Sequence, residues 1–145
     1  MRNIKKYLLT LLISLVLIVA GVGYYLYNKP ARDIKNTDGL EVAATELYAT
    51  FIKDSTAAKK NYTNKILQVS GKVNLLSENQ LHQAVAMLNT NIGGAAINCT
   101  LEGSADGLKA GDSIIIKGIC NGMGEGDADL GIMGDVYLVR CYILK

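Results

Sequence analysis

Two similar stretches, "LQVSGKV" (Leu67–Val73) and "IIIKGIC" (Ile114–Cys120), decide the fold, because each is a run of strand-forming residues with a glycine near its middle. Glycine weakens a strand, since it costs backbone entropy and brings no side chain to pack. In a small closed barrel, however, a long strand must bend to serve both halves of the sheet, and a glycine permits that bend. We therefore predict that Gly71 and Gly118 are structural glycines at the corners of a small β-barrel.

The barrel is predicted to have five strands. Around the first glycine, Leu67, Val69 and Val73 alternate with polar residues, a pattern that gives one buried and one wet face. The predicted strands are residues 67–73, 83–88, 95–101, 113–120 and 135–144. Their order looks antiparallel and no helix between them suits a parallel crossover, so we predict a mainly β fold with a five-stranded OB-like barrel.

One or two helices are predicted before the barrel. Leu40, Ala43, Ala44, Leu47 and Phe51 recur at helical spacing, which predicts a helix that starts near Leu40. Asp54 is a suitable N-cap for a second short helix, "STAAKKNY". We expect both helices to pack on their own domain rather than to bind a partner.

A single transmembrane helix is predicted at the start of the chain. Residues 7–27, "YLLTLLISLVLIVAGVGYYLY", carry no charge, and a helix of that length spans about 30 Å, the thickness of a bilayer core. The flanking basic residues are nearly balanced and do not settle the orientation. A cleaved secretory signal is the alternative, with small residues at Val19, Gly21 and Gly23.

The predicted organisation has four parts. Residues 1–6 are a basic tail, residues 7–27 a signal-anchor helix, residues 28–39 a linker, and residues 40–145 an OB-like domain with its N-terminal helical region. A short basic tail followed by one apolar helix is typical of a signal anchor. We therefore expect a single-pass protein of the cell membrane whose C-terminal domain lies outside the cytoplasm.

The region after the anchor resembles the tRNA_anti-like group of OB-fold domains, which occur in many small exported or membrane-attached bacterial proteins. The matching segments are "LYATFIKDSTAAKKNYTNKILQVSGKV", "INCTLE", "LKAGDSIIIKGICNG" and "DVYLVRCYILK". The resemblance covers residues 40–145 and implies the OB fold. The chain departs from the usual pattern in its longer, glycine-rich connection between the last two strands, and fold alone does not carry function across.

Charge and aromatic content argue against a nucleic-acid-binding surface. From Asp38 onward the chain has 9 Lys and Arg against 12 Asp and Glu, a net charge of −3. Binding of single strands normally needs a basic groove lined with aromatic side chains. Tyr137 and Tyr142 are the only aromatics in the predicted strands, and simple alternation puts them on opposite faces. Nucleic acid is therefore not the expected partner.

The three cysteines fall on three different predicted strands. Taking Lys117, Arg140 and Asn98 as water-facing turns Cys120, Cys141 and Cys99 toward the barrel interior, together with Ile116, Val139 and Ile97. They are either free core thiols or include one disulfide, Cys120 with Cys141 as first choice and Cys99 with Cys141 as second. Their spacing fits neither a zinc site nor a redox C-x-x-C motif.

The remaining polar features do not predict catalysis. The loop at residues 121–135 contains four acidic residues but fails the EF-hand pattern, and we interpret it as a flexible solvated connection. His82 is the only histidine and lies in a polar turn. We expect no enzyme activity, no cofactor and no metal. The expected function is a non-catalytic binding or interaction module at the cell envelope, with its ligand left open and an envelope protein as the candidate partner. The alternatives are a protein that binds single-stranded nucleic acid or another anionic polymer, and a structural spacer.

Overall fold

The chain folds as two compact units, residues 1–32 and 33–145. A computed structural model describes residues 2–28, 33–127 and 129–144. The first unit is one helix, α1 (Arg2–Tyr27). Residues 6–27 of α1 have a mean hydropathy of 2.3 and none of this window is buried, so the helix is long and apolar enough to be a membrane anchor or a signal sequence.

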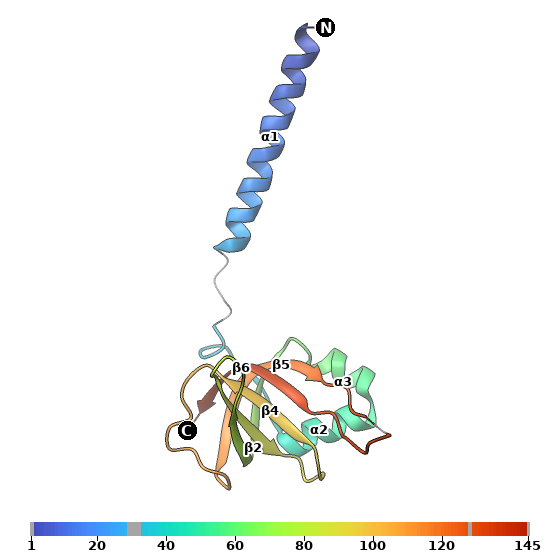
Figure 1. Cartoon of the computed structure of the whole chain (residues 1–145), viewed down its shortest axis with the longest axis vertical. Coiled ribbons are helices and arrows are strands. Elements are labelled where there is room, and N and C mark those ends of the chain that lie inside the picture. The colour runs from blue at the N-terminus through green and yellow to red at the C-terminus, as the bar shows by residue number, and fades with distance from the viewer. Residues whose placement is uncertain (1, 29–32, 128, 145) are drawn as a thin grey trace. The chain divides into compact units, whose positions relative to one another are not determined.

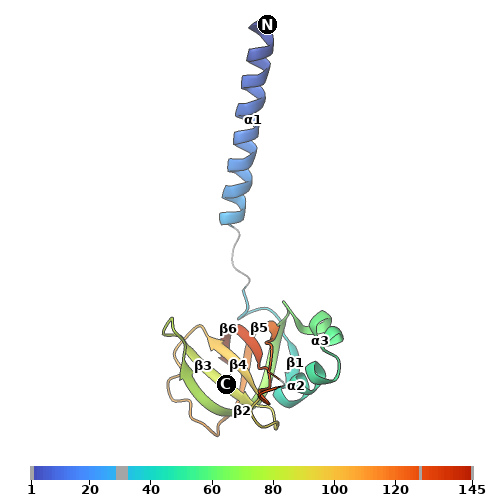
Figure 2. The ribbon, with the colours of Figure 1, turned by 45° about the vertical axis from the view of Figure 1, so that its right-hand side comes forward.

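The second unit is the predicted five-stranded barrel with one further strand (Figures 1 and 2). Its barrel strands are β2 (Ile66–Glu78), β3 (Ala84–Asn89), β4 (Ala96–Leu101), β5 (Ser113–Met123) and β6 (Val136–Leu144). They pair in the order β2-β3-β4-β6-β5, and β5 returns to β2 to close the barrel. All of these pairings are antiparallel except that of β4 with β6. The prediction of a mainly β, closed OB-like fold is confirmed.

Strand β2 serves both halves of the barrel, and its change of partner falls beside Gly71. Residues 66–72 pair with β5, and β2 pairs with β3 from Val73 onward. A Cβ at Gly71 would lie 3.0 Å from the Cβ of Ala44 and 3.2 Å from Cδ1 of Leu88. The missing side chain therefore also leaves room for close packing inside the barrel.

The segment expected to open the first helix is instead a strand. Residues Leu40–Ala43 form β1, which runs parallel to β2 with Val42 opposite Val69. Helix α2 (Ala44–Lys53) begins only after it. The prediction of a helix from Leu40 was wrong because Leu40 and Ala43 happen to sit at helical spacing, whereas Leu40 is half exposed and the backbone pairs with β2.

Helix α2 provides a large part of the core. Leu47, Tyr48 and Phe51 are at most 1% exposed and pack with buried residues of the barrel strands. Helix α3 (Ser55–Tyr62) follows directly, and the two helices lie together beside the barrel (Figure 2). The predicted cap is confirmed, since Oδ1 of Asp54 accepts a hydrogen bond from the N–H of Ala57 at 2.9 Å.

The alternation in β6 breaks at Arg140, which adopts a left-handed φ of 53°. Lys117 of β5 pairs with Tyr142 of β6, whereas Ile119 of β5 pairs with Val139 of β6, so the pairing register shifts by one residue between them. This bulge lets both Leu138 and Cys141 point inward with no exposed surface. The prediction that Val139 faces inward was therefore wrong, while the inward positions of Ile97, Ile116 and all three cysteines are confirmed.

Lys117, expected to face water, is instead only 9% exposed. Its Nζ donates to the carbonyl oxygens of Lys35 and Thr37, at 3.3 and 3.1 Å. Ile34, beside this contact, is fully buried. The folded unit thus begins at residue 33, so residues 33–39 of the predicted linker belong to it, and residues 29–32 lie outside the described residues.

Candidate binding surface

A row of four side chains crosses the outer face of the barrel. Cross-strand pairing joins Leu75 to Met87, Met87 to Asn98, and Asn98 to Tyr137. Directly paired residues share one face of a sheet, so these four form a continuous strip, which we call the outer row. Leu75 and Tyr137 are 50% and 40% exposed, and the other two side chains are half-buried. The outer row therefore offers an aromatic ring, two apolar side chains and one amide.

Tyr137 is held in place by a glycine. A Cβ built on Gly124 would lie 2.8 Å from Cε2 of Tyr137, so the ring rests against the backbone of Gly124. Because of the bulge at Arg140, Tyr137 and Tyr142 both lie on the outside of the barrel, contrary to simple alternation. Tyr142 is half-buried and the ammonium of Lys35 lies 5.9 Å from its ring centroid. Tyr137 is thus the more open of the two rings.

A depression with a volume of about 480 Å³ lies beside the outer row. Met87 belongs to both, and Asn74, Asn89 and Asn91 contribute amides to the lining. The one charged residue in this lining is Asp135, whose Oδ1 accepts a hydrogen bond from the N–H of Ala96 at 2.8 Å. Amides can donate and accept hydrogen bonds without attracting an anion. The depression is therefore suited to a neutral polar ligand.

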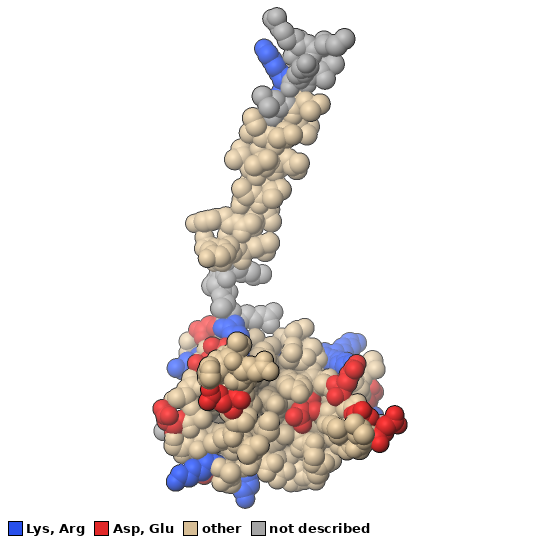
Figure 3. Space-filling view, in the orientation of Figure 1, with Lys and Arg blue, Asp and Glu red and all other residues tan. Residues whose placement is uncertain are grey.

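Charge is scattered over the folded unit. Residues 33–145 contain 10 Lys and Arg against 13 Asp and Glu, a net charge of −3. Figure 3 shows basic and acidic side chains interspersed on the visible face, with neither sign gathered into one continuous patch. Among the described residues of the face shown in Figure 3, the basic side chains do not form a track of the kind that follows a nucleic-acid backbone.

The middle of the outer row, Met87 and Asn98, lies on β3 and β4, the second and third barrel strands, on which the usual binding face of OB barrels is built together with the adjacent loops. The tRNA_anti-like family model matches residues 1–130. The chain belongs to the tRNA_anti-like family. This family has an OB fold, a fold of the type found in nucleic-acid-binding proteins. No curated protein matches the chain.

One solved structure similar to this tRNA_anti-like chain is that of a Leishmania major Friedlin protein described as an aspartyl-tRNA synthetase. The TM-score is 0.44 and the sequence identity is 8%. The match covers 86% of the tRNA_anti-like chain but only 25% of that protein. The chain therefore spans about a quarter of the length of the synthetase-like protein.

The glycine-rich loop of the tRNA_anti-like domain, described at residues 124–127 and 129–135, is exposed to solvent over residues 125–127 and 129–133 but is held by hydrogen bonds of its own. Asp127 and Ile132 exchange two backbone hydrogen bonds of 2.8 Å, and Oδ1 of Asp127 accepts from two further backbone N–H groups. A Cβ at Gly134 would lie 2.1 Å from the carbonyl oxygen of Gly124. The glycines are needed because the two arms of the loop pack backbone against backbone.

The buried hydroxyl of Tyr48 ties this loop to α2, because it donates to the carbonyl oxygen of Gly134 at 2.9 Å. We expect Tyr48→Phe to lower the free energy of unfolding by about 1 kcal/mol, since it leaves a buried carbonyl without this donor. Chemical denaturation of the full chain in detergent measures the change, and Tyr137→Phe, at a half-exposed ring, is the matched control. An equal effect of the two substitutions would contradict the anchoring role of Tyr48.

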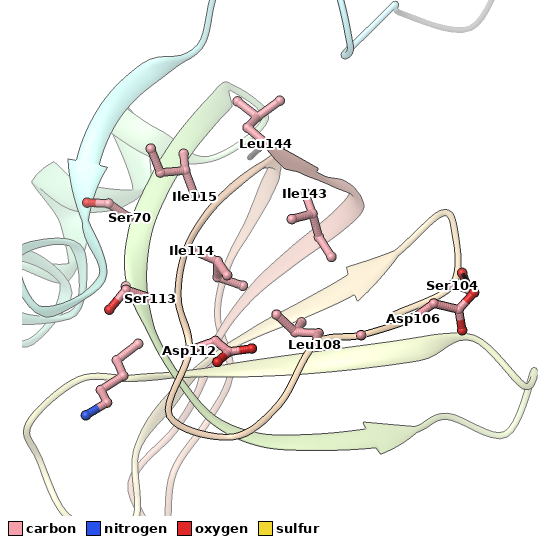
Figure 4. Close-up of a pocket in the computed structure, with 13 residues that line it drawn as sticks. Ser70, Ser104, Asp106, Leu108, Asp112, Ser113, Ile114, Ile115, Ile143 and Leu144 are labelled. Carbon is pink, nitrogen blue, oxygen red and sulfur yellow. Dashed lines mark hydrogen bonds between the residues drawn. The ribbon is translucent and has the colours of Figure 1, made fainter.

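A second cavity, with a volume of about 1020 Å³, opens where β2, β5 and β6 meet the loop at residues 102–112 (Figure 4). Leu108, Ile114 and Ile143 point into it, and its rim is polar. The two rim carboxylates are engaged locally: Asp106 accepts from Ser104 at 2.6 Å and Asp112 accepts from the N–H of Lys109 at 2.9 Å. The cavity is therefore an apolar hollow with a polar rim.

The structure places the other residues singled out in the sequence either in the core or in an exposed turn. Cys99, Cys120 and Cys141 are buried and free, so neither predicted disulfide is present in the structure. His82 is largely exposed, with φ 59°, and its Nδ1 contacts Glu78. Sequence reasoning missed Tyr137 as the centre of a surface, because its usefulness depends on cross-strand neighbours and on Gly124.

Proposed function

We propose that this tRNA_anti-like protein is a membrane-anchored, non-catalytic binding module whose OB barrel engages a protein partner at the cell envelope through the outer row. The observation that carries the proposal is the character of the outer row: it runs from Leu75 through Met87 to Tyr137 and crosses the two strands of the usual OB binding face, with amides rather than basic side chains beside it. Exposed aromatic and Met side chains are enriched in protein interfaces, and Lys is depleted there.

The anchoring part of the proposal is supported by the exposed apolar helix. Leu and Ile side chains of α1 are about half exposed or more in the described residues, so they lack a protein core to bury them. A bilayer supplies that environment. We propose that the barrel lies outside the cytoplasm, as expected for a signal anchor.

Site-specific photo-crosslinking in intact cells tests the proposal. A photoreactive amino acid replaces Tyr137 in the full chain, and the matched control carries it at Lys60, an exposed residue of α3 away from the outer row. We expect a discrete crosslinked protein from position 137 only, in the membrane fraction that resists alkaline extraction. Equal crosslinking from both positions, or release of the full chain by alkali, would overturn the interface or the anchor respectively.

Binding of single-stranded nucleic acid is the second candidate, and the exposed ring of Tyr137 on an OB face favours it. Fluorescence anisotropy with a labelled oligonucleotide at about 50 and 200 mM salt separates the two functions, since phosphate contacts make affinity strongly salt-dependent. Salt-dependent binding that is lost in Tyr137→Ala would replace the protein-partner proposal. We expect no such binding, because the unit is acidic and its outer row is uncharged.

A further inference from the structure

Apolar side chains cover the outer side of the barrel where β2, β5 and β6 run beside one another. Cross-strand pairing joins five of them on this side: Ile66 with Ile119, Ile119 with Val139, and Ile115 with Leu144. The alternate positions of β2 and β5 point into the core, so these side chains point outward, and we call them the apolar outer face. The solvated side of an antiparallel sheet is normally polar. Ile115 is 37% exposed and the other four are half-buried, so part of this face is covered.

The segment that covers it is residues 33–39, which we call the strap. The side chain of Lys117 in β5 lies under the strap, since its Nζ donates to the carbonyl oxygens of Lys35 and Thr37 at 3.3 and 3.1 Å. The ammonium of Lys35 reaches on to β6, where it lies 5.9 Å from the ring centroid of Tyr142. The strap therefore crosses the middle of the outer side of β5 and β6.

The strap also lies close against β2. A Cβ on Gly39 would be 3.3 Å from Cγ2 of Ile66, a residue of the apolar outer face. Ile34 is only 1% exposed, although it does not belong to the cluster of buried residues that forms the barrel core. Its side chain is therefore buried beneath the strap, on the outer surface of the barrel, and serves as the apolar anchor of the strap.

The strap is attached by side chains rather than by strand pairing. Among the residues that the structure describes, no backbone hydrogen bond joins residues 33–38 to a barrel strand, and regular pairing with β2 begins only at Leu40. Within the strap, the carboxylate of Asp33 accepts from the backbone N–H and the side-chain amide of Asn36 at 3.2 and 2.7 Å. These bonds close a turn that does not depend on the barrel. A segment held in this way opens at a lower cost in free energy than a paired strand.

We propose that the strap is detachable and controls access to the apolar outer face. It opens locally, by withdrawal of Ile34, while the barrel strands stay paired. Opening uncovers the apolar outer face and returns the ammonium of Lys117 to water. This device lies on β2, β5 and β6 and is separate from the outer row and from the function proposed for it.

Brief digestion of the folded chain with trypsin separates opening of the strap from unfolding of the barrel, because cleavage follows the population of the opened form. The bond between Lys35 and Asn36 lies in the strap. The bond between Lys72 and Val73 lies in β2, where Lys72 pairs with Ser113 of β5, so its cleavage requires the barrel to open. The full chain in a non-ionic detergent is digested, and mass spectrometry measures the rates at which the fragments beginning at Asn36 and at Val73 appear.

We expect cleavage after Lys35 to be about tenfold faster than cleavage after Lys72 in the unaltered chain. Ile34→Ser should raise the rate at Lys35 by about a further tenfold and leave the rate at Lys72 unchanged, because only the strap loses its buried side chain. The matched control is Ile52→Ser, at a position of α2 that is 49% exposed, and it should change neither rate. Equal rates at the two sites of the unaltered chain would overturn the proposal, and so would Ile34→Ser if it left the rate at Lys35 unchanged or raised both rates equally.

Acetylation of lysine side chains by an N-hydroxysuccinimide ester tests directly whether the strap covers the face. Lys117 is 9% exposed, whereas Lys60 in α3 is exposed and serves as the internal reference. We expect Lys117 to react far more slowly than Lys60 in the unaltered chain, and Ile34→Ser to raise its relative rate by about tenfold with an unchanged circular dichroism spectrum. Labelling of Lys117 as fast as Lys60 in the unaltered chain, or no increase in Ile34→Ser, would contradict a strap that controls access.

Discussion

Replacing Phe51 by alanine should lower the free energy of unfolding by about 3–5 kcal/mol, the largest effect expected for a single side chain of this barrel. Phe51 is 1% exposed in α2 and lies with its ring centroid 6.2 Å from that of Tyr62 in α3. Its removal leaves a cavity between the helices and the strands that rigid neighbours fill only in part. The substitution therefore tests whether α2 belongs to the barrel core.

Guanidinium chloride unfolding of the full chain in detergent, followed by circular dichroism, measures this change. The matched control is Ile52→Ala, at the neighbouring helical position that is 49% exposed, and its effect should stay within about 0.5 kcal/mol. A cost below about 1 kcal/mol for Phe51→Ala would show that the barrel is stable without the packing of α2.

Gly118→Ala should destabilise the folded unit by about 1–3 kcal/mol through overpacking, because the new methyl group would meet Sγ of Cys141 at 2.5 Å. If the sulfur is the obstacle, the same substitution made together with Cys141→Ala should cost less than the sum of the two single changes. The difference in such a double-mutant cycle should reach about 1 kcal/mol. Chemical denaturation of the four chains provides the measurement.

Gly103→Ala is the control for this cycle, because nothing lies within 4 Å of a Cβ there and no left-handed φ is required. It should be neutral or slightly stabilising, since alanine restricts the unfolded chain more than glycine does. Strict additivity of Gly118→Ala and Cys141→Ala would show that Gly118 serves the bend of β5 rather than the space beside Cys141.

The glycines of β2 and β5 illustrate how far local patterns reach. Their position within strand-forming runs was sufficient to predict a closed barrel, because glycine inside a strand often marks a bulge or a tight bend at a barrel corner. The packing role of these two glycines could not be predicted from the local sequence pattern. Gly71 faces Ala44 and Leu88, and Gly118 faces Cys141, and these neighbours come from distant parts of the chain.

The candidate surface was missed for the same reason. Alternation assigned Tyr137 and Tyr142 to opposite faces, but one left-handed residue, Arg140, shifts the register between them. A bulge of this kind is difficult to recognise in the sequence of one strand, because its energetic cost is offset by the hydrogen bonds that β6 makes with both of its neighbouring strands. The outer row exists only through the alignment of four strands.

Interactions between near neighbours in the chain are therefore readable from the amino acids alone: the apolar run of α1, the Asp54 cap, the two-residue period of the barrel strands and the inward cysteines. Each depends on spacing within a few residues, so the pattern and its cause lie in the same segment. The strand character of Leu40–Ala43, the burial of Lys117 and the backbone packing of the glycine loop required the folded chain. In each of these the decisive partner is remote in sequence, and the register of the barrel brings it within reach.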